Sequence, residues 1–385
     1  MKVAIIGAGK IGAALTRFFC NDDDVSTVIL CDRNGQSLNE IETNLNSSKL
    51  RTHRVGIEKE WSITTLIRGF DFLVSALPPE YNVKLTKLAL DIGINYIDLG
   101  STDETLKEQL SYNELAKERN VCIVPNSGFA PGLVNILALH GFEAFDEVES
   151  IKIRAAGLPL EPKPPLNFHL SFSPRALINE YSNDALILEN KNIKKVKALE
   201  GYEKISFDTI TELTDLEAFY TSGQITSLVR MLEGKVDSLD FKTIRYNGHR
   251  DIIRSLFMMG FAEEKIIHVK INLTYRDLLI RQLSKSLSDE DNDIALVKIL
   301  VNGKRDGNSY CRKYEMACTY DDDINMSALL KCAALPTLLT SKLIFQGKHK
   351  NSCGVFPPEK VVPKTDFIDM MKDKDFKIDI AEHEV

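Results

Sequence analysis

The sequence lacks the features that mark secreted, zinc-finger and membrane-spanning proteins. Its 385 residues include seven cysteines, an odd number, and none of them forms a C-x-x-C pair. We therefore expect neither a disulfide framework nor a structural zinc site, and reduced thiols favour a cytoplasmic protein. No uninterrupted apolar run of about 18 residues occurs, and the N-terminus lacks the pattern of a signal peptide. A transmembrane helix is not expected.

An excess of positive charge is also absent. The net charge of −7 argues against nucleic acid or an anionic membrane as a partner. What the chain does have is a hydrophobic content of 44% and a charged content of 27%. This balance is typical of a globular protein, and the length suits two domains.

The N-terminus carries the pattern of a dinucleotide-binding unit. An apolar run at 2–6 is followed by Gly7-x-Gly9-x-x-Gly12, by a helical stretch, and by a second apolar run that ends in Asp32. Gly7 permits a tight turn, Gly9 lets the backbone approach a pyrophosphate, and Gly12 lets the helix pack closely on the strand. Ala8, Lys10 and Ile11 complete the predicted phosphate loop. The alternative is a glycine turn in a domain that has lost its ligand.

The residue after the second strand bears on the choice of cofactor. Asp32 lies 20 residues after Gly12, where a carboxylate can bind both ribose hydroxyls. It would repel a 2′-phosphate, so the sequence favours NAD over NADP. Arg33 could accept a phosphate if it swung inward, which leaves NADP possible.

Strand and helix patterns then alternate as far as residue 125. Repeated β-α units predict a parallel sheet with helices on both faces, an α/β fold of the doubly wound Rossmann type. Ligands of such sheets bind beyond the carboxyl ends of the strands. The residues at these ends are therefore predicted to line the cofactor cleft: Ser75, Ala76, Leu77, Pro78, Asp98, Leu99, Gly100 and 126–128.

The stretch VCIVPNSGFAPGLVN at 121–135 leaves the sixth strand through a bend. Gly128 and Gly132 allow unusual backbone conformations, and Pro131 suits the first turn of a helix. The bend either lies near the nicotinamide end of the cofactor, with Pro131 in contact, or is a plain interdomain linker. Beyond residue 148, alternating runs such as LNFHLSFS at 166–173, and a hairpin around Gly303–Gly307, predict strands of a mixed or antiparallel sheet.

The segment GFAPGLVNILA resembles the crossover motif of the saccharopine dehydrogenase and lysine 6-dehydrogenase family. Further similar motifs follow in the family's order up to about residue 360: GLPLEPKPPLNFHLSFSPRALINEY, LEAFYTSG, TIRYNGH and GVFPPE. Ala130 stands where saccharopine reductases typically have an aspartate, which favours the lysine 6-dehydrogenase branch. The resemblance implies a Rossmann domain at 1–125, an α+β substrate-binding and dimerisation domain at 126–335, and a segment at 336–385 that returns toward the first domain. A homodimer or higher homo-oligomer is expected.

Oxidation of an amine places defined demands on a site. An alkyl ammonium titrates near about 10.4, so a base must remove its proton, and a cation must hold the distant carboxylate. Asp98 is the first candidate for base or ammonium anchor, or else it bonds local backbone N–H groups. His169 and His249 are further catalytic candidates. The predicted substrate ligands are Arg175, by resemblance to an F-S-x-x-R setting, with Arg245 and Thr221. No metal constellation stands out.

Three functions remain open. The leading hypothesis is an NAD(P)-dependent dehydrogenase that converts the ε-amine of L-lysine to the 6-semialdehyde. The first rival is a saccharopine-type dehydrogenase, which makes or breaks a secondary amine. The second is a non-catalytic protein that binds dinucleotide and senses its redox state. It would keep the glycines and Asp32 but need no Asp98, Arg175 or His249.

Overall fold

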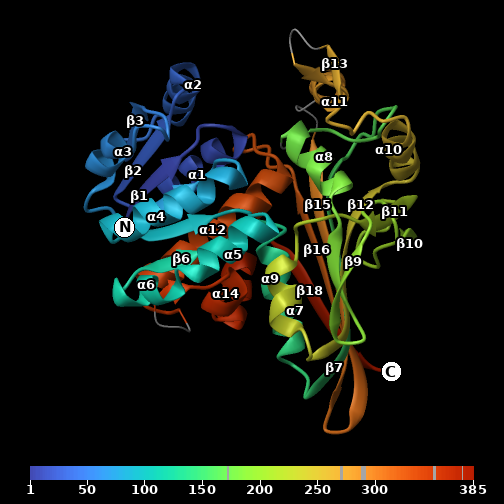
Figure 1. Ribbon diagram of the computed structural model, residues 1–385. Helices are drawn as coiled ribbons and strands as arrows, with labels where there is room; N and C mark the ends of the chain where they lie inside the picture. The colour runs from blue at the N-terminus through green and yellow to red at the C-terminus, as the bar shows by residue number, and fades with distance from the viewer. Residues whose placement is uncertain (171–172, 269–271, 288–291, 350–352, 375) are drawn as a thin grey trace. The chain divides into compact units, whose positions relative to one another are not determined.

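A computed structural model describes residues 1–170, 173–268, 272–287, 292–349, 353–374 and 376–385. The chain divides into two compact units (Figure 1). Unit 1 comprises Met1–His140 and Leu330–Asp375, and unit 2 comprises Gly141–Leu329 and Phe376–Val385. The divisions lie near 140 and 329, where the sequence suggested 125 and 335, and the last ten residues belong to unit 2.

Unit 1 is built on a parallel sheet of seven strands in the order β17-β6-β5-β4-β1-β2-β3. Every pairing in it is parallel. The predicted Rossmann-type sheet is confirmed, with β17 from the C-terminal part of the chain as an additional edge strand. The strands are β1 (Lys2–Ile6), β2 (Thr27–Asp32), β3 (Leu50–Arg54), β4 (Phe72–Ser75), β5 (Asn95–Asp98), β6 (Cys122–Val124) and β17 (Gly354–Val355).

Helices connect these strands, as parallel pairing requires. The apolar runs of the strands are buried on both faces; Ile5, Leu73 and Tyr96 have no exposed surface. The helices are α1 (Lys10–Asn21), α2 (Gly35–Leu45), α3 (Glu60–Ile67), α4 (Asn82–Ile92), α5 (Asp103–Ser111), α6 (Asn113–Glu118), α7 (Leu133–Phe142), α12 (Ala328–Phe345), α13 (Pro358–Val361) and α14 (Lys364–Lys372), with a 3₁₀ turn, η1 (Pro79–Tyr81).

Among the described residues, α12 alone is long and apolar enough to cross a membrane by length and composition, yet 67% of it is buried inside the protein. Its polar groups have partners in unit 1. Thr337 Oγ1 donates to the Ser127 carbonyl at 2.7 Å, and Lys342 Nζ lies 2.8 Å from Asp22 Oδ2. We interpret α12 as a core helix.

Unit 2 contains a nine-stranded mixed sheet in which β12 and β7 pair in parallel and the other pairs are antiparallel. This confirms the predicted mixed sheet, and the hairpin predicted around Gly303–Gly307 is present. The strands are β7 (Glu147–Pro159), β8 (Ala185–Glu189), β9 (Asn192–Val196), β10 (Glu203–Ile205), β11 (Leu216–Tyr220), β12 (Val236–Tyr246), β15 (Asp293–Arg305), β16 (Asn308–Thr319) and β18 (Lys377–Glu384). A separate pair, β13 (Ile266–His268) and β14 (Leu273–Thr274), and the helices α8 (Pro174–Ser182), α9 (Thr226–Leu232), α10 (His249–Met258) and α11 (Tyr275–Ser286) complete the unit.

One predicted strand is wrong. The described part of LNFHLSFS, residues 166–170 and 173, is not extended sheet. Asn167 adopts a left-handed conformation with φ of 49°, which breaks a strand. Leu166, Phe168, His169 and Leu170 are all buried, so the segment forms a core loop whose burial does not alternate.

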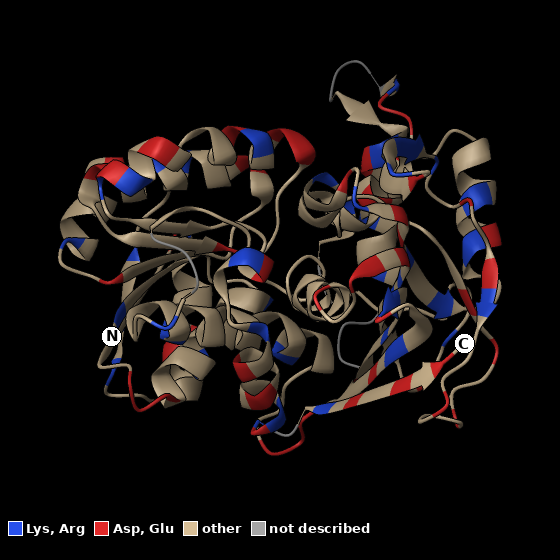
Figure 2. Ribbon diagram, turned by 90° about the horizontal axis from the view of Figure 1, so that it is seen from below, with Lys and Arg blue, Asp and Glu red and all other residues tan. Residues whose placement is uncertain are grey.

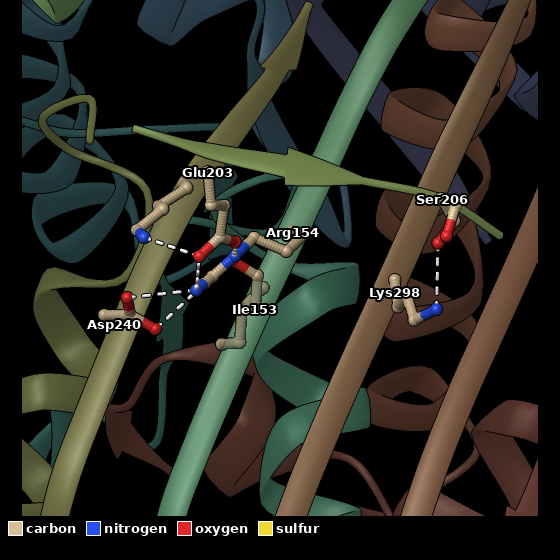
Figure 3. A network of polar contacts seen from close by, with 7 residues as sticks. Ile153, Arg154, Glu203, Ser206, Asp240 and Lys298 are labelled. Carbon is tan, nitrogen blue, oxygen red and sulfur yellow. Dashed lines mark hydrogen bonds and ion pairs between the residues drawn. The ribbon is translucent and has the colours of Figure 1, made fainter. Parts of the chain in front are cut away.

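Charged residues of both signs are interspersed along the elements of both units (Figure 2). In unit 2 some of them form a partly buried network on the sheet (Figure 3). Arg154 of β7 is only 4% exposed, and its Nη1 and Nη2 donate to the two carboxylate oxygens of Asp240 at 2.9 and 3.1 Å. Arg154 and Lys242 both donate to Glu203. The network links β10 to β7 and β12, across the intervening β11, with its charges paired.

Candidate functional site

Two of the three glycines in the turn between β1 and α1, Gly7 and Gly12, are needed for packing within the protein. Gly7 has a φ of 111°, and a Cβ there would lie 2.8 Å from the Ala76 carbonyl oxygen. A Cβ on Gly12 would lie 1.8 Å from the Gly7 carbonyl oxygen. Neither position can hold a side chain without moving backbone, so these glycines are required for the fold itself.

Gly9 is different. Its φ of −79° and ψ of −173° suit any residue, and a Cβ there would meet nothing within 4 Å. Gly9 is the N-cap of α1, and no side chain caps this helix. The backbone N–H groups of the first turn, from Lys10 to Gly12, form the N-terminus of α1, and a helix N-terminus favours the binding of an anion. The open space over Gly9 fits a dinucleotide pyrophosphate.

Asp32 fixes the loop from the end of β2. Its Oδ2 accepts the Ala8 N–H at 2.7 Å, and its Oδ1 accepts the Asn34 N–H at 2.7 Å. The residue is half-buried, and each oxygen retains a lone pair for a ribose hydroxyl. Arg33 is exposed beside it.

The other predicted cofactor residues gather at the carboxyl ends of the strands. The Ala76 N–H donates to the Ile6 carbonyl at 2.8 Å, directly behind Gly7. Ser75 Oγ donates to Asn82 Oδ1 at 2.9 Å. Leu77 has its Cδ2 3.2 Å from the Cβ position of Gly7, and Pro78 precedes η1. Just after β5, Leu99 lies against Gly128, and Pro131 lies near Gly100.

Asp98, at the end of β5, has no exposed surface. Its Oδ1 accepts the Asn126 N–H at 2.9 Å, and its Oδ2 accepts from Gln109 Nε2 at 2.7 Å. Its own carbonyl accepts the Ser127 N–H at 2.7 Å. Burial raises the pKa of Asp98 to about 6, against the lowering effect of these donors. Asp98 thus anchors the turn that follows β6, and its role as a base stays a prediction.

Three polar side chains of unit 2 form a buried chain of hydrogen bonds. His249 is the first residue of α10, Tyr181 lies in the last turn of α8, and Arg245 is on β12. Arg245 Nε donates to Tyr181 Oη at 2.9 Å, and Tyr181 Oη lies 3.0 Å from His249 Nε2. His249 Nδ1 lies 2.9 Å from the Leu166 carbonyl. The structure therefore brings together two predicted site residues, Arg245 and His249.

The protonation states of this chain follow from burial. Burial, with the charge of Arg245, lowers the pKa of His249 to about 3, so the imidazole is neutral at pH 7. Burial raises the pKa of Tyr181 to about 12, so the phenol keeps its proton. Nδ1–H of His249 then donates to the carbonyl of Leu166, and the Tyr181 hydroxyl donates to Nε2. The Tyr181 hydroxyl proton and the His249 Nδ1 proton therefore each have one acceptor.

Arg245 carries a positive charge that is only 3% exposed. Its Nη1 donates to Thr243 Oγ1 at 2.9 Å and to the Ile244 carbonyl at 2.8 Å, and its guanidinium lies 4.6 Å from the ring centroid of Phe168. Among the described residues, no carboxylate lies within the 4.0 Å of an ion pair with Arg245. Glu180 acts on this guanidinium only at longer range, and because a buried cation without a directly bonded anion is costly, Arg245 is suited to bind an anionic ligand.

Sequence reasoning missed two residues here, Tyr181 and Glu180. Glu180 is half-buried, and burial of its carboxyl raises its pKa to about 7, while Arg245 and Gln224 act to lower it. Thr221, a predicted ligand, is buried, and its Oγ1 lies 3.3 Å from Gln224 Oε1. Both residues stand at the end of the motif that contains Arg175, but residue type alone does not mark them as site residues.

The remaining two candidates lie outside this chain of hydrogen bonds. His169 is buried, with its ring centroid 6.2 Å from that of Phe168. The side chain of Arg175 is 61% exposed, and its Nη2 lies 3.6 Å from Asp277 Oδ1 on α11. Their roles stay predictions.

Unit 1 has a Rossmann-type sheet with an uncapped helix N-terminus, and unit 2 has a buried arginine; both features are typical of a dinucleotide-dependent oxidoreductase. Residues 3–124 match the family model of the saccharopine dehydrogenase NADP binding domain, and residues 128–376 match that of the saccharopine dehydrogenase C-terminal domain. The chain belongs to the saccharopine dehydrogenase family. It is an NAD(P)-dependent oxidoreductase that acts on amino-acid-like substrates.

Two similar proteins span nearly the whole chain. Carboxyaminopropylagmatine dehydrogenase from Synechocystis is 19% identical over 377 residues, covering 94% of this chain and 93% of that protein. The structure of apo saccharopine dehydrogenase (L-Glu forming) from Saccharomyces cerevisiae matches with a TM-score of 0.77 and 14% identity, over 100% of this chain and 99% of that one. This structural likeness establishes the common fold.

Proposed function

We propose that the protein oxidises the ε-amine of L-lysine with NAD, releasing ammonia and the 6-semialdehyde. The observation that carries the proposal is Arg245, a buried guanidinium with no carboxylate within ion-pair distance among the described residues. An amino-acid carboxylate supplies the missing anion. A guanidinium can bind it through charge-assisted hydrogen bonds, which position the far end of the substrate.

The chain of hydrogen bonds through Tyr181 and His249 keeps the guanidinium of Arg245 in place. Tyr181 accepts from Arg245 Nε at 2.9 Å and donates to His249, whose Nδ1 is tied to backbone. These bonds fix the orientation of Arg245 before substrate binds, so less ordering is required on binding. Tyr181 and His249 act as positioning residues in this proposal.

Glu180 is the base that we propose, and Asp98, the first candidate from the sequence, is the alternative. A pKa raised to about 7 by burial lets its carboxylate take a proton from the substrate ammonium near neutral pH. The nearby charge of Arg245 keeps the deprotonated form accessible. Loss of hydride from the amine carbon leaves an imine, and water then adds and expels ammonia.

The groups of unit 1 would hold the cofactor, which supplies the hydride acceptor when bound. The first turn of α1 would bind the pyrophosphate, and Asp32 would bind the ribose hydroxyls. Because a carboxylate repels a 2′-phosphate, we propose NAD as the preferred form, although the matching family model is named for NADP.

A saccharopine-type reaction on a secondary amine is the alternative. It is supported by the names of the family models and of the structural relative from yeast. Saccharopine carries additional carboxylate groups and would require further cations. Arg175, exposed at the start of α8, is the candidate from the sequence.

The test is an assay of the purified protein with NAD or NADP and either L-lysine or saccharopine, following the absorbance of the reduced nicotinamide. Reduction that depends on lysine, without added keto acid, supports the proposal. Turnover with saccharopine alone selects the alternative. Tight cofactor binding without turnover of any amine would indicate a redox sensor instead.

A further inference from the structure

Three side chains with metal-ligand atoms converge at one edge of the parallel sheet. Cys122 is the first residue of β6, and His349 and Cys353 come shortly before β17. The Sγ atoms of the two cysteines lie 3.1 Å apart, and Cys122 Sγ lies 3.9 Å from His349 Nε2. One ligand atom from each residue lies within 4.8 Å of the others. Cys122 is buried, and the other two are partly exposed.

Backbone pairing fixes two of these residues next to each other. β17 lies parallel to β6 with Gly354 opposite Cys122, and the Gly354 N–H donates to the Val121 carbonyl at 3.0 Å. Asn113 Oδ1 accepts the Val355 N–H at 3.0 Å. Cys353 therefore reaches Cys122 because the strands are in register.

We propose that Cys122, His349 and Cys353 bind a zinc ion, with a water molecule as the fourth ligand. Two thiolates and an imidazole form a donor set that selects zinc over magnesium or calcium. His349 and Cys353 are separated by three residues, a spacing that zinc-binding loops use. Zn–S bonds of about 2.3 Å and Zn–N bonds of about 2.0 Å place tetrahedral ligand atoms roughly 3.5–3.8 Å apart. The observed cluster reaches that geometry with small side-chain movements.

The imidazole favours a metal over a simple disulfide. Oxidation of the thiol pair would involve only Cys122 and Cys353. His349 Nδ1 is buried and, within the described part of the chain, has no hydrogen-bond partner, so no protein group there fixes its tautomer. Nε2 can therefore present a lone pair toward the thiols. Zinc would displace one proton from each thiol, and the two thiolates would balance its charge.

Such an ion would fasten the returning C-terminal segment to the sheet. β17 has two residues and β6 has three, so few backbone bonds hold this edge. β6 leads directly into the turn at 126–132, which Asp98 anchors. A metal at Cys122 would therefore stabilise this edge of unit 1 from the amino end of β6, opposite to the carboxyl ends of the strands that line the predicted cofactor cleft.

The test begins with the full chain, treated with reductant and chelator and then desalted. It is titrated with Zn²⁺ against a chromophoric chelator, and the metal retained after a second desalting is measured. We expect one zinc per chain for the wild type. His349→Gln and Cys353→Ser should weaken binding by about ten-fold or more, a loss at least as large as that caused by removing an outer-sphere partner. His383→Gln and Cys311→Ser, outside the cluster, should bind as the wild type does.

Cobalt binding to the wild type gives a second readout that does not depend on the folding of variants. A thiolate-to-metal charge-transfer band is expected, and its absence would overturn the proposal. Equal zinc affinity in wild type, His349→Gln and Cys353→Ser would also overturn it. So would a Cys122–Cys353 disulfide in the isolated protein together with no zinc binding after reduction.

Discussion

Tyr181 Oη lies 3.0 Å from His249 Nε2, and both groups are buried. The same oxygen accepts from Arg245 Nε at 2.9 Å, so the phenol connects a guanidinium to a neutral imidazole. The three residues come from two helices and a strand of unit 2. The pair defines the position of Arg245, on which the proposed chemistry depends.

Replacing Tyr181 by phenylalanine tests this connection. The change leaves Arg245 Nε and His249 Nε2 buried without their partner, so we expect the free energy of unfolding to fall by about 1–3 kcal/mol. KM for the amino-acid substrate should rise, because Arg245 is no longer fixed. Tyr246→Phe is a matched control: it also loses one hydrogen bond, to the Pro159 carbonyl, but lies outside the chain. An unchanged KM in Tyr181→Phe would argue against the positioning role.

The raised pKa of Glu180 predicts a pH dependence of both activity and stability. In the wild type, kcat/KM should increase as pH rises through about 7, as the carboxylate forms. Because the folded-state pKa exceeds the unfolded one, the folded protein binds the proton more tightly, and stability falls as pH rises from about 4.5 to 7. Glu180→Gln should lose activity and be more stable than the wild type above pH 7. A pH profile of stability identical in both proteins would contradict the assignment.

Two glycines of the phosphate loop should respond differently to alanine. Gly9→Ala adds a Cβ into open space, so the melting temperature should change little while the Kd for NAD(P) rises, by about ten-fold or more if the methyl group occupies the pyrophosphate position. Gly12→Ala places a Cβ 1.8 Å from the Gly7 carbonyl oxygen and should lower the melting temperature strongly. Calorimetry of cofactor binding and thermal unfolding measure both. An unchanged Kd for NAD(P) in Gly9→Ala would show that the pyrophosphate does not bind over Gly9.

Asp32→Ala tests the choice of cofactor. The substitution removes the proposed ribose acceptor and also two bonds to backbone N–H groups, so some loss of stability is expected. Affinity for NAD should fall far more than affinity for NADP, since the repulsion of a 2′-phosphate disappears. Equal losses for both cofactors would mean that the carboxylate does not contact the ribose.

The fold of unit 1 could be predicted from the sequence because the signals that specify it are local. The strand, the glycine spacing and Asp32 lie within 32 residues, and the alternation of β and α patterns specifies parallel pairing. β17 was not predictable in the same way. It has two residues, and only tertiary contacts place it beside Cys122, more than 200 positions earlier.

The candidate site in unit 2 could be predicted only in part. Arg245 and His249 were identified by residue type and motif, but their link through Tyr181 depends on three separate elements meeting in space. Glu180 acquires its raised pKa from burial, which no local pattern encodes. The failed strand at LNFHLSFS shows the same limit, because an alternating pattern was overridden by a left-handed Asn167 and by packing of neighbouring side chains.

The binding of a substrate carboxylate by Arg245 is the central claim, and a cycle of two substrates and two proteins tests it most directly. The substrates are L-lysine and 1,5-diaminopentane, which lacks the carboxylate, and the proteins are the wild type and Arg245→Met. Exposed Arg254→Met, outside every predicted site residue, serves as the matched control. We predict that kcat/KM of the wild type favours lysine by about 100-fold, as a charged hydrogen-bonded pair allows, and that this preference collapses in Arg245→Met alone. A preference for lysine that survives in Arg245→Met would contradict the account.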